Sequence, residues 1–122
     1  MLSPEQIDAY CLQKPGAHPD FPFGPRPACY KVMGKIFAEL YSDPADYKIT
    51  LTCSPEDTAL FRSLYEGVVV RGYYCPPAQQ ACWNTVYIAR IDDGVLMDMI
   101  DRSYARVAGK LPRRLRAQLE NA

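Results

Sequence analysis

The chain opens with the pattern of a capped amphipathic helix. Ser3 can cap the first turn, Pro4 suits the first helical position, and Gln6 completes a capping box with Ser3. Apolar side chains then recur at helical spacing until residues 15–16, where Pro-Gly ends the pattern. The sequence therefore predicts a helix at the N-terminus.

The next segment, residues 15–28, has neither helical nor strand periodicity. It holds five prolines, which remove backbone donors and exclude a helix or a central strand. Phe21 and Phe23 are its only large apolar side chains apart from the prolines. We expect an ordered loop that these two phenylalanines pin to the body of the protein.

Alternating apolar and polar residues predict strands through the middle of the chain. The segments with this pattern are 29–33, 35–41, 46–53, 68–74 and 83–91. Gly34 separates the first two by a turn, which is typical of a hairpin. Such a run of strands favours an antiparallel sheet.

Three more helical segments complete the pattern. Ser54 caps a helix that begins at Pro55 and ends before Gly67. A long helix spans about residues 94–110, and a short one follows Pro112. The order is therefore α-β-β-β-α-β-β-α-α, which predicts an α+β domain with an antiparallel sheet and helices packed mainly on one face.

The period of two along each strand assigns side chains to a core face and an open face of the sheet. The aromatic side chains expected on the open face are Phe37, Tyr41, Tyr73, Trp83 and Tyr87. The cations expected among them are Lys35, Lys48 and Arg71. Two interpretations fit this face. Aromatic rings among cations bind single-stranded nucleic acid, or the loops 15–28 and 74–82 cover the rings as a second small core.

The composition is that of one globular domain over residues 1–122, with 48% apolar and 23% charged side chains. No apolar run approaches the roughly 18 residues that cross a bilayer, so we expect no membrane partner. The N-terminus lacks the basic and apolar blocks of a signal peptide, which predicts a cytoplasmic protein. We also expect a monomer.

The net charge of zero hides a basic C-terminal segment. Residues 1–101 hold 8 basic and 13 acidic side chains, whereas residues 102–122 hold 6 basic and 1 acidic. The last fifth of the chain is therefore a basic segment on an acidic body.

Two groups of cations make up this segment. Arg102, Arg106 and Lys110 follow one ridge of the long helix, where Asp98 and the helix dipole can account for them. The cations beyond that helix, which have no acidic neighbour in the sequence, are Arg113, Arg114 and Arg116. This second group forms either a phosphate-contact patch or a solvated face.

Catalytic and metal-binding patterns are weak throughout. His18 is the single histidine, so neither a Ser/His/Asp site nor a histidine metal site has its usual partners. The five cysteines form no C-x-x-C pair, and we expect them to be mostly buried and free, although Cys75 and Cys82 could meet across a loop. No glycine-rich segment has the spacing of a phosphate loop. We therefore expect no enzyme, no metal site and no cofactor.

The ordered motifs resemble the MmcQ/YjbR family of small bacterial proteins. The matching segments are PGAHPDFPFG (15–24), YKVMGKIFAEL (30–40), YEG…GYY (65–74), WNTVYI (83–88) and IDRSYARVAGKLPRRLR (100–116). The resemblance implies an α+β double-wing fold, similar to the frataxin-like (CyaY-like) sandwich. It also implies DNA binding, an attribution that in the family rests largely on the fold.

Family motifs fall on specific positions of this chain. The W-N-T motif falls on Trp83, Asn84 and Thr85, the K-x-x-G-K hairpin on Lys31, Gly34 and Lys35, and the basic ending on Lys110 to Arg114. The loop CPPAQQAC just before the tryptophan departs from the family, whose members commonly carry basic residues and a histidine there. This departure places a phosphate-contacting role for the loop in doubt.

We therefore predict a non-enzymatic DNA-binding protein of weak affinity. The residues expected at the nucleic acid are Lys31, Lys35, Lys48, Arg71, Trp83, Asn84, Arg106, Lys110, Arg113, Arg114 and Arg116. The cations would contact phosphates, and Trp83 would stack or pack at the interface. Asn84 would hydrogen-bond a base edge or, as we favour, hold its loop.

Two other functions fit the sequence less well. The first is a protein-interaction module that uses the open aromatic face. The second is a metal carrier, which the frataxin-like fold suggests. It ranks last because Glu5 and Asp8 are the only acidic side chains of the first helix.

Overall fold

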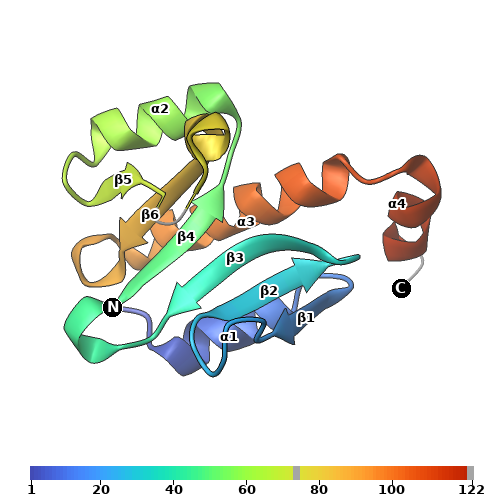
Figure 1. Ribbon diagram of the computed structural model, residues 1–122, viewed down its shortest axis with the longest axis horizontal. Coiled ribbons are helices and arrows are strands. Elements are labelled where there is room, and N and C mark those ends of the chain that lie inside the picture. The colour runs from blue at the N-terminus through green and yellow to red at the C-terminus, as the bar shows by residue number, and fades with distance from the viewer. Residues whose placement is uncertain (73–74, 121–122) are drawn as a thin grey trace.

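A six-stranded antiparallel sheet forms the centre of the protein, and most of its helices lie on one face (Figure 1). The computed structural model describes residues 1–72 and 75–120. The helices are α1 (Pro4–Leu12), α2 (Pro55–Leu64), α3 (Asp93–Gly109) and α4 (Arg113–Glu120). The strands are β1 (Ala17–Asp20), β2 (Ala28–Val32), β3 (Lys35–Tyr41), β4 (Lys48–Thr52), β5 (Val69–Arg71) and β6 (Trp83–Tyr87), in the spatial order β1-β2-β3-β4-β6-β5. Short 3₁₀ turns cover Pro44–Asp46, Pro77–Cys82 and Ile88–Arg90. The predicted α+β class is confirmed.

The predicted capping box at the N-terminus is present. The Ser3 hydroxyl accepts a hydrogen bond from the backbone N–H of Gln6 at 3.1 Å, and the Gln6 side chain accepts one from the Ser3 N–H at 2.8 Å. One face of α1 then buries Ile7 and Cys11 completely. The local signals at this end of the chain are therefore enough to start the helix and orient it.

The proline-rich segment contains a strand that the sequence did not predict. Residues 17–20 form β1, which pairs with β2 and places Pro19 opposite Tyr30. Proline is tolerated here because β1 is the edge strand of the sheet. The expected anchoring by phenylalanines is wrong, since Phe21 and Phe23 are 52% and 71% exposed.

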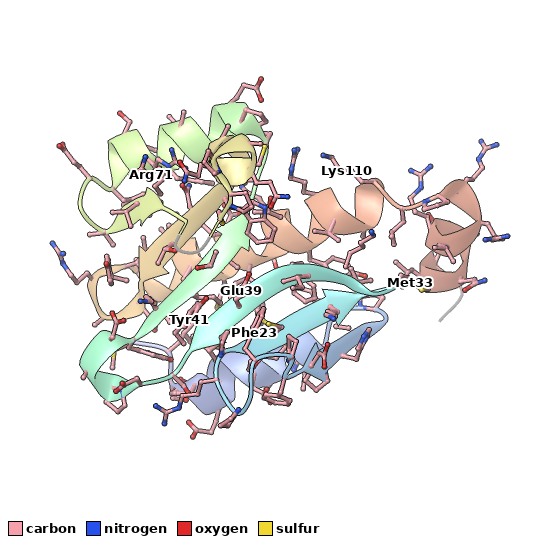
Figure 2. All side chains as sticks on the ribbon, in the orientation of Figure 1. Phe23, Met33, Glu39, Tyr41, Arg71 and Lys110 are labelled. Carbon is pink, nitrogen blue, oxygen red and sulfur yellow. The ribbon has the colours of Figure 1, made fainter. Side chains whose placement is uncertain are left out.

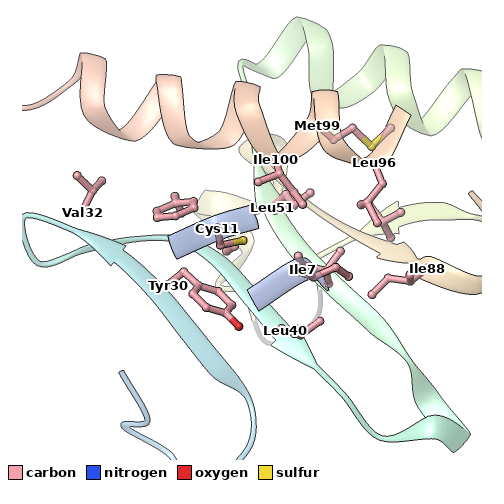
Figure 3. Packing of buried hydrophobic residues seen from close by; sticks show 14 of the residues in the cluster. Ile7, Cys11, Tyr30, Val32, Leu40, Leu51, Ile88, Leu96, Met99 and Ile100 are labelled. Carbon is pink, nitrogen blue, oxygen red and sulfur yellow. The ribbon is translucent and has the colours of Figure 1, made fainter. Parts of the chain in front are cut away.

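The main core lies between the sheet and the helices α1 and α3 (Figure 3). From α3, Leu96, Met99 and Ile100 point into it, as the helical spacing predicts. Tyr30 enters from β2, and its hydroxyl donates to the Asp8 carboxylate of α1 at 2.7 Å. The five cysteines are free, so no disulfide supports this core.

A β-bulge in β3 overturns part of the predicted open face. Tyr30 lies opposite Ala38, but the next residue of β2, Lys31, lies opposite Ile36, so Phe37 is the extra residue. Phe37 is fully buried, and its ring packs edge-on against Tyr104 of α3 at 5.3 Å between centroids. The expectation of an exposed Phe37 is wrong because the bulge interrupts the alternation on which it rested.

The bulge also changes the place of Lys35. This residue pairs with the fully buried Val32, so it belongs to the helix side of the sheet rather than to the open face. Arg71 was likewise misplaced: it pairs with Asn84, whose side chain bonds to α2. Both corrections follow from strand pairing, which sequence alternation alone does not specify.

The rest of the open face follows the predicted alternation. Tyr41, Lys48 and Tyr87 share it through the pairs Tyr41–Lys48 and Lys48–Tyr87, and Trp83 shares it through Thr52. Lys48 is only 6% exposed, forms an ion pair with Asp46 at 2.5 Å and lies 5.2 Å from the centre of the Tyr41 ring. Tyr73, the remaining predicted member, lies outside the described residues.

Candidate nucleic-acid interface

A cleft opens where β3 and β4 separate. These strands pair only from Ala38 to Tyr41 on β3, and beyond the bulge they diverge while α3 crosses behind them (Figure 1). Ser103 of α3 fills the point of divergence. Its hydroxyl accepts a hydrogen bond from the Thr52 N–H at 2.9 Å and donates one to the Phe37 carbonyl. The side chain thus bridges the two strands just beyond their last backbone pair and satisfies one polar group on each.

The cleft has a volume of about 620 Å³ and lies between the start of β3, the ends of β4 and β6, and the last turns of α3. We call it the basic cleft. Its cations are Lys35, Arg106 and Lys110. Trp83 forms part of its wall, together with apolar side chains from Ile36, Val107 and Leu111. No carboxylate is among its lining residues in the described part of the chain.

The cations of the basic cleft have no acidic partner among the described residues, in contrast to Arg102 one turn earlier on α3. Arg102 bonds to Asp98 at 2.8 Å and approaches Asp57 at 3.3 Å. By contrast, Lys35 and Lys110 are exposed and have no ion pair among the described residues. The dipole of α3 favours the cations in its last turn, but it does not account for Lys35 on β3.

Arg106 has a neighbour, but a weak one. Its Nη2 lies 3.5 Å from the Sγ of Cys82, at the end of the 3₁₀ turn Pro77–Cys82. A thiol is a weak hydrogen-bond acceptor. The thiol therefore holds the guanidinium in the cleft, and no carboxylate among the described residues of the cleft neutralises its charge.

Asn84, next to Trp83, has a structural role in this fold. It is 5% exposed, its amide donates to the Thr58 carbonyl of α2 at 3.1 Å, and its carbonyl accepts from Nε of Arg62 at 2.6 Å. On the opposite face of β6, the Thr85 and Thr50 hydroxyls are 2.8 Å apart. These contacts support the interpretation that Asn84 holds its loop.

Arg62 completes this clamp, and the sequence analysis missed it. Besides Asn84, it donates to the carbonyls of Gln80 and Trp83, so it ties α2 to the middle of the 3₁₀ turn Pro77–Cys82 and to the start of β6. Burial, followed by the nearby Arg71, lowers the pKa of the Arg62 guanidinium. In the sequence, Arg62 is only a basic residue beside the apolar positions of α2. This pattern is common and does not reveal that the residue bonds α2 to β6.

The other predicted contact residues lie at separate places. Lys31 forms an ion pair with Asp20 at 2.6 Å near the β1 edge, and Arg71 lies beside α2 and β5, away from Lys110 in Figure 2. The exposed side chains of α4 include Arg113, Arg114 and Arg116. The structure thus brings together Lys35, Trp83, Arg106 and Lys110, with the α4 arginines following directly after the cleft residue Pro112.

The side chains that commonly bind metals are scattered over the described part of the chain. His18 is exposed on β1, where its Nδ1 lies 3.3 Å from the Gly16 carbonyl. Among residues 1–72 and 75–120, no three histidine, cysteine or acidic side chains are grouped so that they could hold a metal ion. Over the same residues, no helix has both the length and the apolar character needed to cross a bilayer.

Comparisons with known proteins agree with the architecture. The protein resembles Deinococcus radiodurans protein DR2400, a DUF419 protein, with a TM-score of 0.88, 20% identity, and coverage of 98% of this chain and 89% of that one. It also resembles a protein from Pseudomonas syringae, with a TM-score of 0.69, 20% identity, and coverage of 84% of this chain and 96% of that one. No curated protein sequence matches the chain. A family model described as YjbR matches residues 12–106, and the chain therefore belongs to the YjbR family.

Proposed function

We propose that this protein binds DNA and catalyses no reaction on it. The observation that carries the proposal is the basic cleft, where cations from β3 and α3 converge beside Trp83 with no carboxylate among the described lining residues. Unpaired cations bind phosphates, and aromatic rings bind bases. The proposal is also consistent with membership of the YjbR family, because the resemblance to that family implies DNA binding.

The arginines of α4 would extend the same surface. Arg113, Arg114 and Arg116 are exposed and follow the cleft in the chain, so a strand lying in the cleft could continue along them. Such contacts add affinity without reading sequence. Because the whole chain has a net charge of zero, we expect weak binding that salt abolishes readily. We also propose that the protein acts in the cytoplasm as a monomer.

The proposal is tested by titrating labelled DNA at about 50 mM and about 200 mM salt. Replacing Arg113 and Arg114 with Gln should weaken binding and lower the salt slope by about 1 for each phosphate that the variant no longer neutralises. The matched control replaces Arg26 and Arg90, two exposed arginines away from the cleft, which changes the net charge equally. Absence of binding at low salt, or equally weakened binding in both variants, would contradict the proposal.

A protein-interaction module on the aromatic sheet face has less support. In the middle of that face Thr50 and Thr85 are fully buried and Lys48 is 6% exposed, which leaves little continuous surface for a partner. Salt-insensitive binding to a protein, with none to DNA, would favour this alternative.

A further inference from the structure

We infer that the basic cleft accepts an unpaired stretch of a single nucleic-acid strand, with a base against Trp83 and the neighbouring phosphates on Lys35, Arg106 and Lys110. This inference rests on the proposed function and deepens it, because it distinguishes single strands from duplexes at this site.

The dimensions of the cleft favour an unpaired nucleotide. Its volume of about 620 Å³ lies within the range of pockets that enclose small molecules, roughly 300–1,000 Å³. A duplex is too wide to enter such a pocket. Its bases are also stacked on both faces, so none offers a ring face to Trp83 unless it leaves the stack. Only an unpaired base can therefore reach the tryptophan.

The chemistry of the lining matches the two parts of a nucleotide. Trp83, Ile36 and Val107 provide aromatic and aliphatic surface for a flat base. Arg106 lies in the last turn of α3, and Lys110, four residues further on, is its C-cap, so the two lie about 6 Å apart along the helix axis and on the same side of it. Lys35 faces the same cleft from β3. Charge on two elements around an apolar wall fits a base with its flanking phosphates.

The wall that carries Trp83 is fixed before any ligand arrives. The Trp83 carbonyl accepts hydrogen bonds from the Gly72 N–H and from Arg62, each at 3.0 Å. The preceding residue, Cys82, is held by the Cys53 N–H at 2.9 Å and by the Thr52 hydroxyl at 2.7 Å. These bonds fix the backbone of this wall, so it loses little conformational entropy when a ligand binds.

The cations, by contrast, are available to a ligand. Lys35 and Lys110 have no ion pair in the described residues, and the Cys82 thiol beside Arg106 is a weak acceptor. Phosphate oxygens would be their first strong acceptors, and charge-assisted bonds to them are about twice as strong as neutral ones. Figure 2 shows Lys110 at the end of α3, pointing away from the body of the helix.

The experiment compares three probes of equal length on the wild-type protein: an oligothymidine strand, an abasic strand and a blunt duplex. Trp83 is the only tryptophan, so its fluorescence reports directly on the cleft. The oligothymidine strand should bind roughly ten-fold more tightly than the abasic strand and should quench Trp83, because only the former can stack. The abasic strand should bind through charge and leave the emission nearly unchanged.

Two variants separate base stacking from phosphate contact. Trp83→Leu should bring the affinity for oligothymidine down to that for the abasic strand, whereas Lys110→Gln should weaken both strands by the same factor. Thermal unfolding checks that each variant folds, and the wild-type comparison does not depend on them.

Equal affinity for the two strands with unchanged Trp83 emission would overturn this inference. If the duplex still bound and depended on the α4 arginines, the proposed DNA binding would stand without it. If none of the three probes bound at low salt, both proposals would fall.

Discussion

Residues at neighbouring positions in the sheet have different roles on its two faces. Asn84 points to the helix side and fastens α2, whereas its neighbour Trp83 points to the other side and reaches the basic cleft. Glu39 is also on the side away from the helices, partly buried, with the Tyr41 hydroxyl donating to it at 3.1 Å. Burial raises the pKa of the Glu39 carboxyl, and the bond from Tyr41 offsets this only in part.

The raised pKa of Glu39 predicts a pH-dependent stability. A carboxyl whose folded-state pKa is raised stabilises the fold below its ordinary value of 4.5, and this contribution is lost as the pH rises through the folded-state pKa. We therefore expect Glu39→Gln to be more stable than the wild type near neutral pH and nearly equal to it below about pH 4. Urea unfolding at both pH values measures the difference.

The exposed Glu66→Gln serves as the control for Glu39→Gln. It should show little difference from the wild type at either pH, because a solvated carboxylate has no burial cost to relieve. A Glu39 variant that behaves like this control would contradict the assignment of a burial cost to Glu39.

At the scale of elements, the cleft lies where β3 and β4 stop pairing, next to the bulge in β3 and the side chain of Ser103. Phe37 turns into the core, β3 and β4 part, and the backbone groups left without strand partners bond to Ser103. The cleft therefore lies where α3, through Ser103, holds β3 and β4 at the point where they stop pairing.

Ser103→Ala should destabilise the protein by about 2 kcal/mol or more, because it leaves the Thr52 N–H and the Phe37 carbonyl buried without their partner. Alanine has the higher helix propensity, so any loss of stability must come from these bonds. Denaturant unfolding measures the change. The exposed Ser63→Ala on α2 is the matched control and should stay within about 0.5 kcal/mol of the wild type. Equal effects of the two substitutions would show that Ser103 does not hold the strands.

At the scale of the whole molecule, the turn after α1 packs against the C-terminal helices. The side chain of Leu119 in α4 packs at Gly16, and the Tyr104 hydroxyl of α3 donates to the Pro15 carbonyl at 2.5 Å. Because α4 follows the cleft residue Pro112 directly in the chain, this docking fixes the position of the helix that carries the arginines. The segment after α1 and the C-terminal helix are thus energetically linked.

Gly16→Ala should weaken this docking. Gly16 has a φ of +72°, and an added Cβ would lie 2.4 Å from the Leu119 Cδ2. A left-handed conformation costs a residue with a Cβ about 1–2 kcal/mol, and we expect a destabilisation of this size together with faster hydrogen exchange in α4. Gly109→Ala, where the Cβ would meet nothing within 4 Å, should be neutral or slightly stabilising. Unchanged exchange in α4 of the Gly16 variant would contradict the link.

Much of the fold follows from the sequence because its signals are local. The Ser3 and Ser54 caps, the turn at Gly34 and the spacing of apolar residues in α3 each depend on neighbours in the chain, and each prediction is confirmed. The ordered motifs were enough to identify the family. Local chemistry thus determined the element order apart from β1, and the cationic character of the C-terminal segment.

Tertiary structure decided everything that depends on pairing between distant residues. The register of β2 against β3 places the bulge at Phe37, moves Lys35 to the helix side and opens the cleft. Strand pairing likewise places Arg71 on the face of the sheet opposite to Trp83. It also brings Asn84 within hydrogen-bond distance of Arg62 on α2. A one-residue change of register exchanges the two faces of a strand at no cost in local sequence pattern, so alternation alone could not show which predicted residues share one site.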